Sequence, residues 1–577
     1  MNKTIEFEIL RSAPCGVVLT GGKCAEKVEL IRQWKGEFCK SKLINRGATP
    51  ARINRVVLFQ IAHNLPGATC LYGEGFQMLS QTGGTLEKPA DIGTHTDRDH
   101  IRLPAPANIT VVYGLLTLSP PNADHILMAF TSCRRFSGAF HILKGSIEVV
   151  IDTEDLVLEP GECWQLEEFM FKAGTDKNAL LTELADRIAV YHPPLRSEAV
   201  PTGWCSWYCF GPEVTSEQVI DNCDFISSQL PALKYVQIDD GYQPAMGDWL
   251  ETGPAFGGGV QTVLKHIREH GCEPAIWVAP FIAEESSCVF QNHPDWFFKD
   301  SNGKPLRSDL VTYGGWRRGP WYSLDGSHPE VQKHLESTFR TMREIWGCTY
   351  FKLDAQVWGA LHCGKFFDPK STRVQAYRQG MEAILRGTGD SFILGCNHPL
   401  WPSFGLYHGA RTSNDIYRDW YWVSHVAKET FHRNWQNGQF WWNDPDCFLL
   451  TGDLPDNEFQ FHLTATYASG GMLLSGDDLT KLTPKQLGTL RKLIPPTGIS
   501  AQFTDDTFRI GFIPLPDKLM ICLFNWSEEP QSLSVCLPYP CRITDFWTDE
   551  WTGYHEEECK VENMPPHSAM LLTCVRD

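Results

Sequence analysis

The chain has 577 residues, of which 42% are hydrophobic and 12% aromatic, so it can bury a large core and build more than one domain. Its formal net charge is −18 at pH 7 and no run of lysine or arginine interrupts it, which argues against nucleic-acid binding. No apolar run is long enough to cross a bilayer, and the first residues lack an apolar export signal. We therefore expect a cytoplasmic protein that binds neither nucleic acid nor membrane.

The 20 cysteines are spread thinly along the chain, and many lie inside apolar runs such as 520–523. This pattern favours buried free thiols over a disulfide framework. The sequence has no Cys-x-x-Cys motif, and the short-range pair Cys205 and Cys209 lacks a matching histidine pair. We therefore predict no metal site.

Short runs of alternating apolar and polar residues fill residues 1–190, for example 54–59 and 147–151. A period of two is typical of half-buried strands, so we predict an N-terminal β-sandwich domain over 1–190. A helix-like stretch at 179–188 precedes prolines 193, 194 and 201, which mark the end of this domain.

From 191 to 495 short apolar runs alternate with amphipathic, helix-like stretches, which predicts a central (β/α)8 TIM barrel. The longest insertion, at about 284–322, is rich in tryptophan and is expected to cover the mouth of the barrel. Alternating runs return over 496–577 and predict a small C-terminal β-sandwich, giving a multidomain α/β and β protein. Eight segments are the candidate strand ends: 203–207, 238–240, 276–280, 352–354, 393–396, 411–415, 440–444 and 472–477.

Acidic residues follow three of these strands, at Asp239-Asp240, Asp354 and Asp415. In a parallel barrel all strands deliver their last side chains to one rim, so these carboxylates should converge. An aspartate at a strand end can also cap the following helix, but that explanation weakens when three successive even-numbered strands carry one. Two carboxylates can cleave an acetal, because one attacks or stabilises the sugar while the other supplies and withdraws a proton.

Basic residues accompany both members of the pair that we favour, Asp354 and Asp415. Lys352 lies two residues before Asp354 and should project to the same side of its strand, where it favours an ionised nucleophile. Arg411 precedes Asp415 in one strand-loop unit and can hold a ring hydroxyl beside a general acid/base. The sequence therefore predicts glycosidase chemistry.

Several segments together resemble the α-galactosidases of glycoside hydrolase family 36 (melibiases, clan D), in motif order and over most of the barrel. The resemblance implies a retaining, exo-acting hydrolysis of terminal α-linked galactose through a covalent intermediate, without a cofactor. It also implies flanking β domains like those predicted above. The matching segments are 203–208, 238–242, 247–249, 350–354, 395–415 and 442–447.

Roles follow from the resemblance position by position. Asp354 is similar to the family nucleophile and Asp415 to its acid/base. Asp239 and Asp240 resemble the acceptors for the galactose 6- and 4-hydroxyls.

Five further residues resemble the family's sugar contacts. Lys352 would bind around the 3- and 4-hydroxyls. Arg411 and Cys396 match positions near the sugar's 2-position. Trp207 and Trp296 match aromatic residues that line the subsite.

Two segments depart from the family pattern. Residues 75–80 replace the stretch that usually lends an aromatic lid residue, and Asn397-His398 replace small residues near the 2-substituent. Preference for α-N-acetylgalactosamine, β-L-arabinopyranose, or transfer to a sugar acceptor therefore stays open. A non-catalytic sugar-binding protein and a metal-dependent hydrolase are the rivals from other classes; the second lacks a supporting histidine cluster. The expected partner is an oligosaccharide or glycoside substrate, with homo-oligomers possible.

Overall fold

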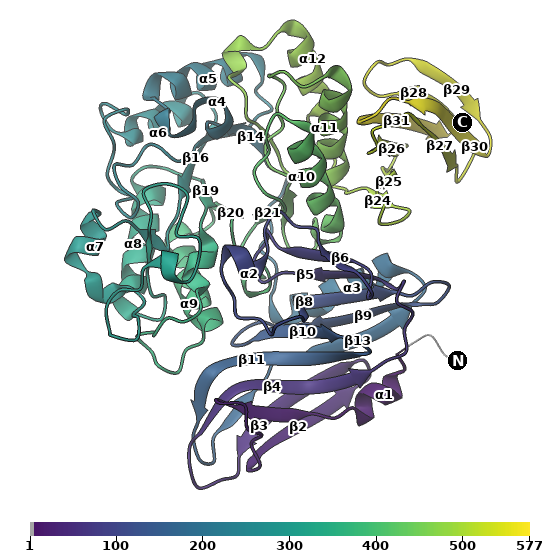
Figure 1. Ribbon diagram of the computed structural model, residues 1–577. Helices are drawn as coiled ribbons and strands as arrows, with labels where there is room; N and C mark the ends of the chain where they lie inside the picture. Colours follow the sequence, from purple (N-terminus) through teal and green to yellow (C-terminus); the bar gives the residue numbers. More distant parts are fainter. Residues whose placement is uncertain (1–4, 577) are drawn as a thin grey trace.

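Antiparallel strands build the N-terminal part of the protein, in a computed structural model that describes residues 5–576 (Figure 1). Thirteen strands join into one hydrogen-bonded sheet, with β3 pairing with β2, β12 and β13. Along β3 the inward residues alternate with outward ones, which is the predicted period of two. The strands are β1 (Gly16–Leu19), β2 (Val28–Lys35), β3 (Phe38–Asn45), β4 (Ala51–Ala62), β5 (Cys70–Glu74), β6 (Gln81–Gly84), β7 (Pro89–Asp91), β8 (Thr110–Ser119), β9 (His125–Phe130), β10 (Ser137–Leu143), β11 (Ser146–Leu158), β12 (Cys163–Gln165) and β13 (Phe169–Gly174). The helices are α1 (Phe7–Ser12), α2 (Asp97–His100) and α3 (Lys177–Tyr191).

Eight parallel strands form the centre of the molecule, and all eight predicted strand ends fall at or just beyond them. Each strand pairs with its neighbours in the order β22-β21-β20-β19-β16-β15-β14-β23. The ring is nearly closed, since the Met472 amide donates to the Asn443 carbonyl at 2.7 Å between β22 and the start of β23. The predicted TIM barrel is therefore confirmed. The strands are β14 (Thr202–Cys205), β15 (Tyr235–Ile238), β16 (Glu273–Val278), β19 (Tyr350–Leu353), β20 (Phe392–Gly395), β21 (Gly409–Arg411), β22 (Trp442–Asp444) and β23 (Leu473–Ser475).

Amphipathic helices surround the barrel. In α6 the residues Val260, Val263, Leu264 and Ile267 form one buried stripe at helical spacing. The α-helices of this part are α4 (Trp207–Phe210), α5 (Ser216–Gln229), α6 (Val260–Glu269), α7 (Cys288–Asn292), α8 (Pro329–Glu344), α9 (Arg373–Thr388), α10 (Trp420–His432), α11 (Asp456–Ser469) and α12 (Pro484–Leu493). The 3-10 turns are η1 (Gly211–Glu213), η2 (Pro294–Trp296), η3 (Ser308–Leu310), η4 (Gln356–Ala360), η5 (Trp401–Ser403), η6 (Asn434–Gln436) and η7 (Leu479–Lys481).

Two short antiparallel strands, β17 (Ile282–Ala283) and β18 (Tyr322–Ser323), pair at the two ends of the long insertion after β16. The N-terminal sheet approaches the same side of the barrel. Its loop 75–80 exchanges backbone hydrogen bonds with the loop after β20: Met78 donates to the His398 carbonyl at 3.0 Å, and Leu400 to the Phe76 carbonyl at 2.7 Å. The loop that departs from the family pattern therefore supports the barrel directly.

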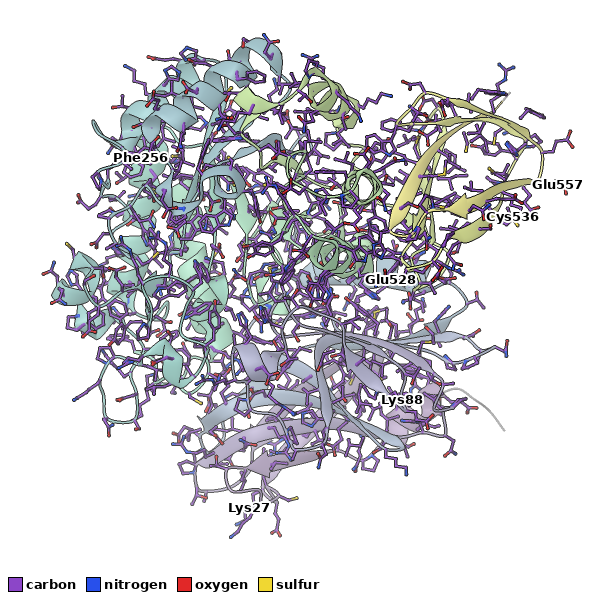
Figure 2. All side chains as sticks on the ribbon, turned by 45° about the horizontal axis from the view of Figure 1, so that its top comes forward. Lys27, Lys88, Phe256, Glu528, Cys536 and Glu557 are labelled. Atoms are coloured by element: carbon purple, nitrogen blue, oxygen red, sulfur yellow. The ribbon has the colours of Figure 1, made fainter. Side chains whose placement is uncertain are left out.

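The C-terminal part is a separate β structure beside α10 and α11 (Figure 1). A six-stranded antiparallel sheet packs against the β27–β30 pair through a small apolar core that includes Ile521, Leu533 and Ile543. In Figure 2 the labels Lys27 and Lys88 mark the N-terminal part and Phe256 marks the barrel part. The C-terminal part is marked by the labels Glu528, Cys536 and Glu557. The strands are β24 (Gln502–Phe503), β25 (Ile510–Pro514), β26 (Leu519–Asn525), β27 (Gln531–Cys536), β28 (Cys541–Asp545), β29 (Trp551–His555), β30 (Glu558–Met564) and β31 (Ser568–Arg576).

We propose the domain limits 1–190, 191–495 and 496–577, because α3 ends at Tyr191 and α12 at Leu493. The 20 cysteines are free thiols, and more than half of them are buried. Among residues 5–576, none of the helices has both the length and the apolar character needed to cross a membrane.

Candidate active site

Asp354 follows β19 and is held by three N–H donors. Its Oδ2 accepts a hydrogen bond from Trp277 Nε1 at 3.0 Å, and its Oδ1 accepts from the Ala355 amide at 2.7 Å and from Asn397 Nδ2 at 2.8 Å. The donors come from β16, from the turn after β19 and from the loop after β20. Such a set fixes the direction of the carboxylate, as a nucleophile requires.

Asp415 lies four residues beyond Arg411, which ends β21. The guanidinium donates to Asp415 Oδ1 from Nη1 at 3.2 Å and from Nη2 at 3.1 Å. The Arg411 side chain is 1% exposed, whereas that of Asp415 is 38% exposed. Asp415 is thus anchored from beneath and open to the solvent side, which suits a group that exchanges protons with substrate and water.

Asp446, after β22, is a second carboxylate that binds Arg411. Its Oδ2 lies 3.1 Å from Arg411 Nη2 and accepts from the Ile416 amide at 2.7 Å and from the Tyr208 hydroxyl. Burial alone would lower the pKa of Arg411, but the acidic groups around it, Asp446 first and Asp415 among them, together outweigh burial and raise the pKa well above its usual value. The guanidinium therefore stays charged in a buried position.

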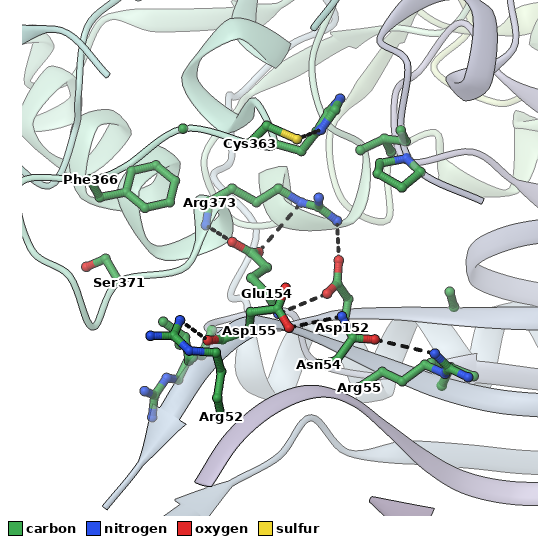
Figure 3. Close-up of a pocket in the computed structure, with 18 of the residues that line it drawn as sticks. Arg52, Asn54, Arg55, Asp152, Glu154, Asp155, Cys363, Phe366, Ser371 and Arg373 are labelled. Carbon is green, nitrogen blue, oxygen red and sulfur yellow. Dashed lines mark hydrogen bonds and ion pairs between the residues drawn. The ribbon is translucent and has the colours of Figure 1, made fainter. Parts of the chain in front are cut away.

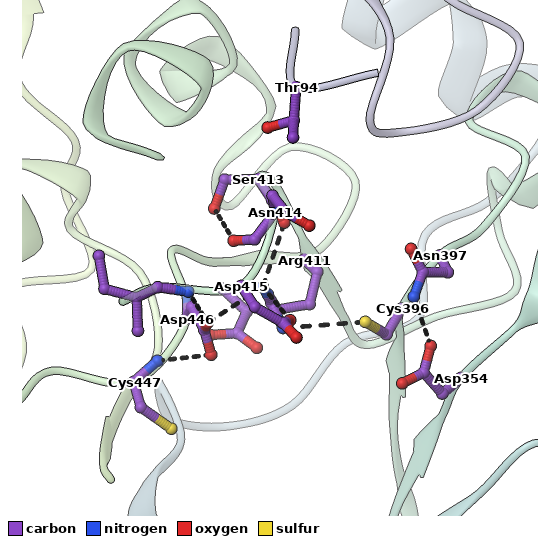
Figure 4. A network of polar contacts seen from close by, with 12 residues as sticks. Thr94, Asp354, Cys396, Asn397, Arg411, Ser413, Asn414, Asp415, Asp446 and Cys447 are labelled. Atoms are coloured by element: carbon purple, nitrogen blue, oxygen red, sulfur yellow. Dashed lines mark hydrogen bonds and ion pairs between the residues drawn. The ribbon is translucent and has the colours of Figure 1, made fainter. Parts of the chain in front are cut away.

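The two candidate catalytic residues have Cys396 between them (Figure 4). Burial, followed by the charge of Asp354, raises the pKa of the Cys396 thiol, and Asp415 adds to the rise. The same two carboxylates, after burial, raise the pKa of the Tyr313 phenol. Figure 4 shows Cys396 between Asp354 and the Arg411–Asp415 pair, with Cys396 Sγ 3.8 Å from Arg411 Nη1. Asp354 and Asp415 thus border the same region.

Asp239 and Lys352 form a buried ion pair on the floor of this region. Lys352 Nζ lies 3.0 Å from Asp239 Oδ2, which also accepts from Gln237 Nε2 at 2.6 Å. Burial would lower the pKa of Lys352, but the charges around it, Asp239 first and Asp354 among them, together outweigh burial and raise the pKa well above the usual value. The charged ammonium of Lys352 therefore interacts with two carboxylates, Asp239 and Asp354.

Asp240 is bound by Arg317, a residue that the sequence did not single out. Arg317 Nε donates to Asp240 Oδ2 at 3.1 Å and Nη2 binds Oδ1, while Gln243 Nε2 donates to Oδ1 at 2.6 Å. Burial raises the pKa of Asp240, although Arg317 opposes the rise. The insertion after β16 therefore reaches the barrel mouth through a guanidinium as well as through Tyr313.

Trp207 and Trp296, the two predicted aromatic contacts, lie in different places. Trp207 begins α4, is half-buried and packs on the apolar cluster inside the barrel. Trp296 stacks on His293 with ring centroids 3.8 Å apart and lies 5.3 Å from the His334 ring of α8. One of these neighbours lies in the insertion itself and the other on the outer helix α8, so neither contact places Trp296 beside the sugar residues predicted with it.

Sequence reasoning missed several residues of the region. Asn397 was noted only for the 2-substituent and binds Asp354 instead, while His398 is turned into the core against Tyr407 and Trp441. Asp446 carried a signal, because an acid in the strand-end segment 442–447 fits the pattern of the other strands. No sequence signal pointed to Arg317, since it lies in an irregular loop, where no regular spacing of residues indicates which way a side chain points. Burial raises the pKa of a further acid at this strand end, Asp444, to about 6.

A cavity of about 930 Å³ lies elsewhere, between the N-terminal sheet and residues 361–373 (Figure 3). Arg373 bridges its two walls, with Nη2 3.0 Å from Asp152 Oδ2 and its amide bonded to Glu154 at 2.9 Å. None of the nine predicted site residues lines it. We interpret this cavity as a polar junction between two parts of the chain.

Comparison with known proteins identifies relatives. The melibiase family model matches residues 235–365. The A type blood α-D-galactosamine galactosaminidase of Flavonifractor plautii is 30% identical over 212 residues, which are 34% of this chain and 18% of that protein. The myogenesis-regulating glycosidase of Mus musculus is 26% identical over 153 residues, or 26% of this chain and 20% of its own length. The aligned regions thus span about a fifth of these curated relatives.

Solved structures are similar over much more of the chain. An α-galactosidase from Thermus thermophilus, in complex with p-nitrophenyl α-D-galactopyranoside, has a TM-score of 0.64 at 20% identity and covers 85% of this chain and 98% of its own. The α-galactosidase AgaA of glycoside hydrolase family 36 from Geobacillus stearothermophilus has a TM-score of 0.64 at 12% identity, covering 97% and 89%. At these identities the likeness establishes the fold, and together with the family model it confirms the predicted resemblance.

Proposed function

We propose that this chain, which is similar to the α-galactosidases of glycoside hydrolase family 36, is a retaining, exo-acting glycoside hydrolase that removes terminal α-linked galactose from oligosaccharides. The observation that carries the proposal is the pair of aspartates, Asp354 and Asp415, which lie on either side of Cys396 (Figure 4) and differ in their surroundings. Asp354 is fixed by three N–H donors, whereas Asp415 is bound at one oxygen and more exposed. This asymmetry matches the two roles of a retaining glycosidase.

In the first step Asp354 attacks the anomeric carbon and forms a β-galactosyl ester, while Asp415 donates a proton to the departing oxygen. Trp277 and Asn397 keep the attacking oxygens in place. Arg411 holds Asp415 Oδ1, and among the described residues Oδ2 has no hydrogen-bond donor, so it is available to the leaving group.

In the second step Asp415 acts as a base. It withdraws a proton from water, which attacks the anomeric carbon from the side that the leaving group vacated and releases Asp354. Two inversions give net retention, and the carboxyl groups of such enzymes are about 5 to 5.5 Å apart. We further propose that Asp239, Asp240, Lys352, Cys396, Arg411 and Trp207 contact the sugar, with Arg317 added.

The roles can be tested with an aryl α-galactoside as substrate. Asp354→Asn and Asp354→Ala should remove activity, while Asp390→Asn, an exposed acid outside the region, should keep it. With azide, Asp354→Gly should form the β-galactosyl azide, because azide attacks from the vacated nucleophile side. Asp415→Gly should form the α-galactosyl azide. Near-normal turnover of either Asp354 variant, or the reverse stereochemistry of the azides, would contradict the assignment.

A second candidate is hydrolysis of a 2-amino or 2-acetamido galactoside. The name of the Flavonifractor plautii relative, 30% identical over its aligned segment, favours it. Against a 2-ammonium group stands the buried guanidinium of Arg411, beside Cys396, where the resemblance locates the 2-position. Initial rates on aryl α-galactoside and on its 2-amino and 2-acetamido analogues distinguish the candidates; we expect the plain galactoside to be fastest.

The partner and location also remain proposals. Thermus thermophilus α-galactosidase is described in complexes with p-nitrophenyl α-D-galactopyranoside and stachyose, which supports an α-galactoside or oligosaccharide as substrate here. We propose a cytoplasmic enzyme in carbohydrate metabolism that needs no cofactor and binds neither nucleic acid nor membrane. Two further properties to be measured are transfer of galactose to a sugar acceptor and assembly into homo-oligomers.

A further inference from the structure

Thiol, imidazole and carboxylate groups meet on the outer side of the barrel, between α5 and α6. Cys223 and Asp224 lie on α5 and His266 lies on α6, and their ligand atoms are all within 4.8 Å of one another. Cys272, directly before β16, is a second buried thiol next to α6, because its amide donates to the Ile267 carbonyl of that helix at 3.1 Å. Three separate segments therefore supply one cluster, in the α5–α6 region of Figure 1.

The imidazoles of this cluster are already oriented. His266 Nε2 is 2.7 Å from Asp224 Oδ1. The His270 ring stacks on His266 with centroids 3.9 Å apart, and its Nδ1 donates to the His266 carbonyl at 2.9 Å. That bond fixes the tautomer and leaves His270 Nε2 3.7 Å from Asp224 Oδ1. Both rings thus face the same carboxylate.

A hydrogen-bonded surface pair explains Asp224 and His266, because such pairs are common on helices. It does not explain two buried thiols beside them. Two sulfurs, an imidazole and a carboxylate are a donor set that suits zinc.

We propose that Cys223, Cys272 and His266, with Asp224 as the fourth ligand, bind a thiolate-preferring divalent metal ion, Zn²⁺ in the cell. Bonds of about 2.3 Å to sulfur and about 2.0 Å to nitrogen separate ligand atoms in a tetrahedron by roughly 3.5 Å. The ligand atoms of Cys223, Asp224 and His266 already lie within 4.8 Å of one another, so small side-chain rotations bring these three to that spacing. Binding deprotonates both thiols, so it releases up to two protons to solvent.

The position of the cluster indicates a structural role. Cys272 precedes β16, so the cluster lies toward the amino ends of the strands, whereas Asp354 and Asp415 follow the carboxyl ends of theirs. Groups at the amino-terminal side of a barrel serve stability. The ion would clamp α5 and α6 to the start of β16. The sequence prediction of no metal site rested on ligands close together in sequence, and these ligands are 43 and 6 residues apart.

The test uses the untagged, full-length chain, reduced with a phosphine and freed of metal. Co²⁺ should bind at one equivalent per chain with a thiolate-to-cobalt charge-transfer band, and Zn²⁺ should displace it and raise the melting temperature. Cys223→Ser, Cys272→Ser and His266→Gln should each weaken Co²⁺ binding at least tenfold. Cys348→Ser, a buried thiol outside the cluster, is the matched control and should bind Co²⁺ as the unaltered chain does.

Three results would overturn the proposal. The first is a reduced chain that takes up neither Co²⁺ nor Zn²⁺. This result overturns the proposal even if Cys223 and Cys272 form a disulfide when the chain is oxidised. The second is a charge-transfer band that survives both Cys272→Ser and His266→Gln. The third is a loss of Co²⁺ affinity in the Cys348→Ser control as large as the loss in the three ligand variants. His266 is partly exposed, so its variant keeps the test readable if Cys223→Ser fails to fold. Hydrolysis of galactosides is a separate measurement, and its failure would leave the metal result intact.

Discussion

The guanidinium of Arg317 makes the insertion after β16 part of the sugar site that we propose. It binds both carboxylate oxygens of Asp240, and its side chain is 25% exposed while that of Asp240 is 2% exposed. A planar fork can hold a carboxylate in one orientation, which a lysine cannot do. Asp240 would then present a fixed acceptor edge to the sugar hydroxyl.

We predict that Arg317→Ala lowers kcat/KM on an aryl α-galactoside by roughly 10- to 100-fold, the effect of losing a hydrogen bond to a charged group. The change should lie mainly in KM, because the contact orients a binding group and is present before the chemical step. Arg317→Lys should lose less. Steady-state kinetics on both variants measure this.

Arg318 offers a matched control, since it is adjacent but binds the Pro244 carbonyl and lies 3.6 Å from Glu284. Its side chain is 42% exposed. Arg318→Ala should change kcat/KM by less than about threefold. If both alanine variants lose activity equally, the effect belongs to folding of the insertion and the role of the Arg317–Asp240 pair is refuted.

At the scale of elements, the short helix α2 fixes the loop that supports the barrel. Its buried Asp97 accepts hydrogen bonds from the Phe76 amide at 2.7 Å and the Gln77 amide at 3.2 Å. Burial raises the pKa of Asp97 to about 6, although these amides oppose the rise. The folded state therefore holds this proton more tightly than the unfolded chain does.

A carboxyl whose folded pKa is raised contributes stability that is fully present below the unfolded pKa and is lost as the pH rises through the folded pKa. For Asp97 the loss should begin near pH 4, the ordinary pKa of the unfolded carboxyl, and be nearly complete just above pH 6, the folded pKa. Asp97→Asn cannot titrate, so between pH 5 and 8 it should lose roughly 1 kcal/mol less stability than the unaltered chain. Urea unfolding at both pH values measures the difference.

Asp99→Asn is the control, because Asp99 lies in the same helix but is exposed. It should follow the unaltered chain at both pH values. An Asp97→Asn variant with the same pH dependence as the unaltered chain would show that Asp97 does not titrate in this range.

The barrel strands were predictable because they are short, largely buried runs, several of which break off at an acidic residue. In β14, β19 and β20 every residue is buried, and the sequence there is mainly apolar, with Lys352 of β19 as the charged exception. The ends of such runs locate Asp239, Asp354 and Asp415 at one rim without further information. Pairing in a single thirteen-stranded sheet was not predictable in the N-terminal part, since alternation reveals strands but not their partners.

The positions that we propose for site residues follow from the sequence where residues lie at or just beyond strand ends, and not where they lie in the long insertion. The direction of Lys352 follows from its spacing to Asp354 on β19. Arg317 and Trp296 both lie in the insertion, which has no regular period, and the structure directs the first to Asp240 and the second to α8. The cluster of Cys223, His266 and Cys272 escaped for the same reason, since only the packing of α5 on α6 brings it together.

At the scale of the whole molecule, the N-terminal sheet and the barrel share a buried ion pair. Arg433, after α10, donates to Glu74 of β5 from Nε at 3.1 Å and from Nη2 at 2.6 Å, and both side chains are 0% exposed. Arg433 Nη1 also donates to the Thr412 carbonyl at 2.8 Å. Thr412 follows Arg411, so this pair connects the sheet to the segment that carries Asp415.

Removing one partner of such a pair leaves the other as an uncompensated buried charge, at a cost of about 3–5 kcal/mol. Arg433→Met should therefore lower the free energy of unfolding by that amount, and it should also reduce turnover, because the Thr412 carbonyl loses its donor. The double variant Glu74→Leu with Arg433→Met removes both charges and should recover part of the stability but not the turnover.

The ion pair of Arg46 and Glu29 is the reference, because it is exposed, with side chains 61% and 47% exposed, and lies within the N-terminal part alone. Arg46→Ala should cost less than about 1 kcal/mol and leave turnover unchanged. Urea unfolding and initial rates on one substrate give both quantities for all four proteins. If Arg433→Met matches Arg46→Ala in both, the sheet and the barrel are not coupled through Glu74, and the N-terminal part has no bearing on the position of Asp415.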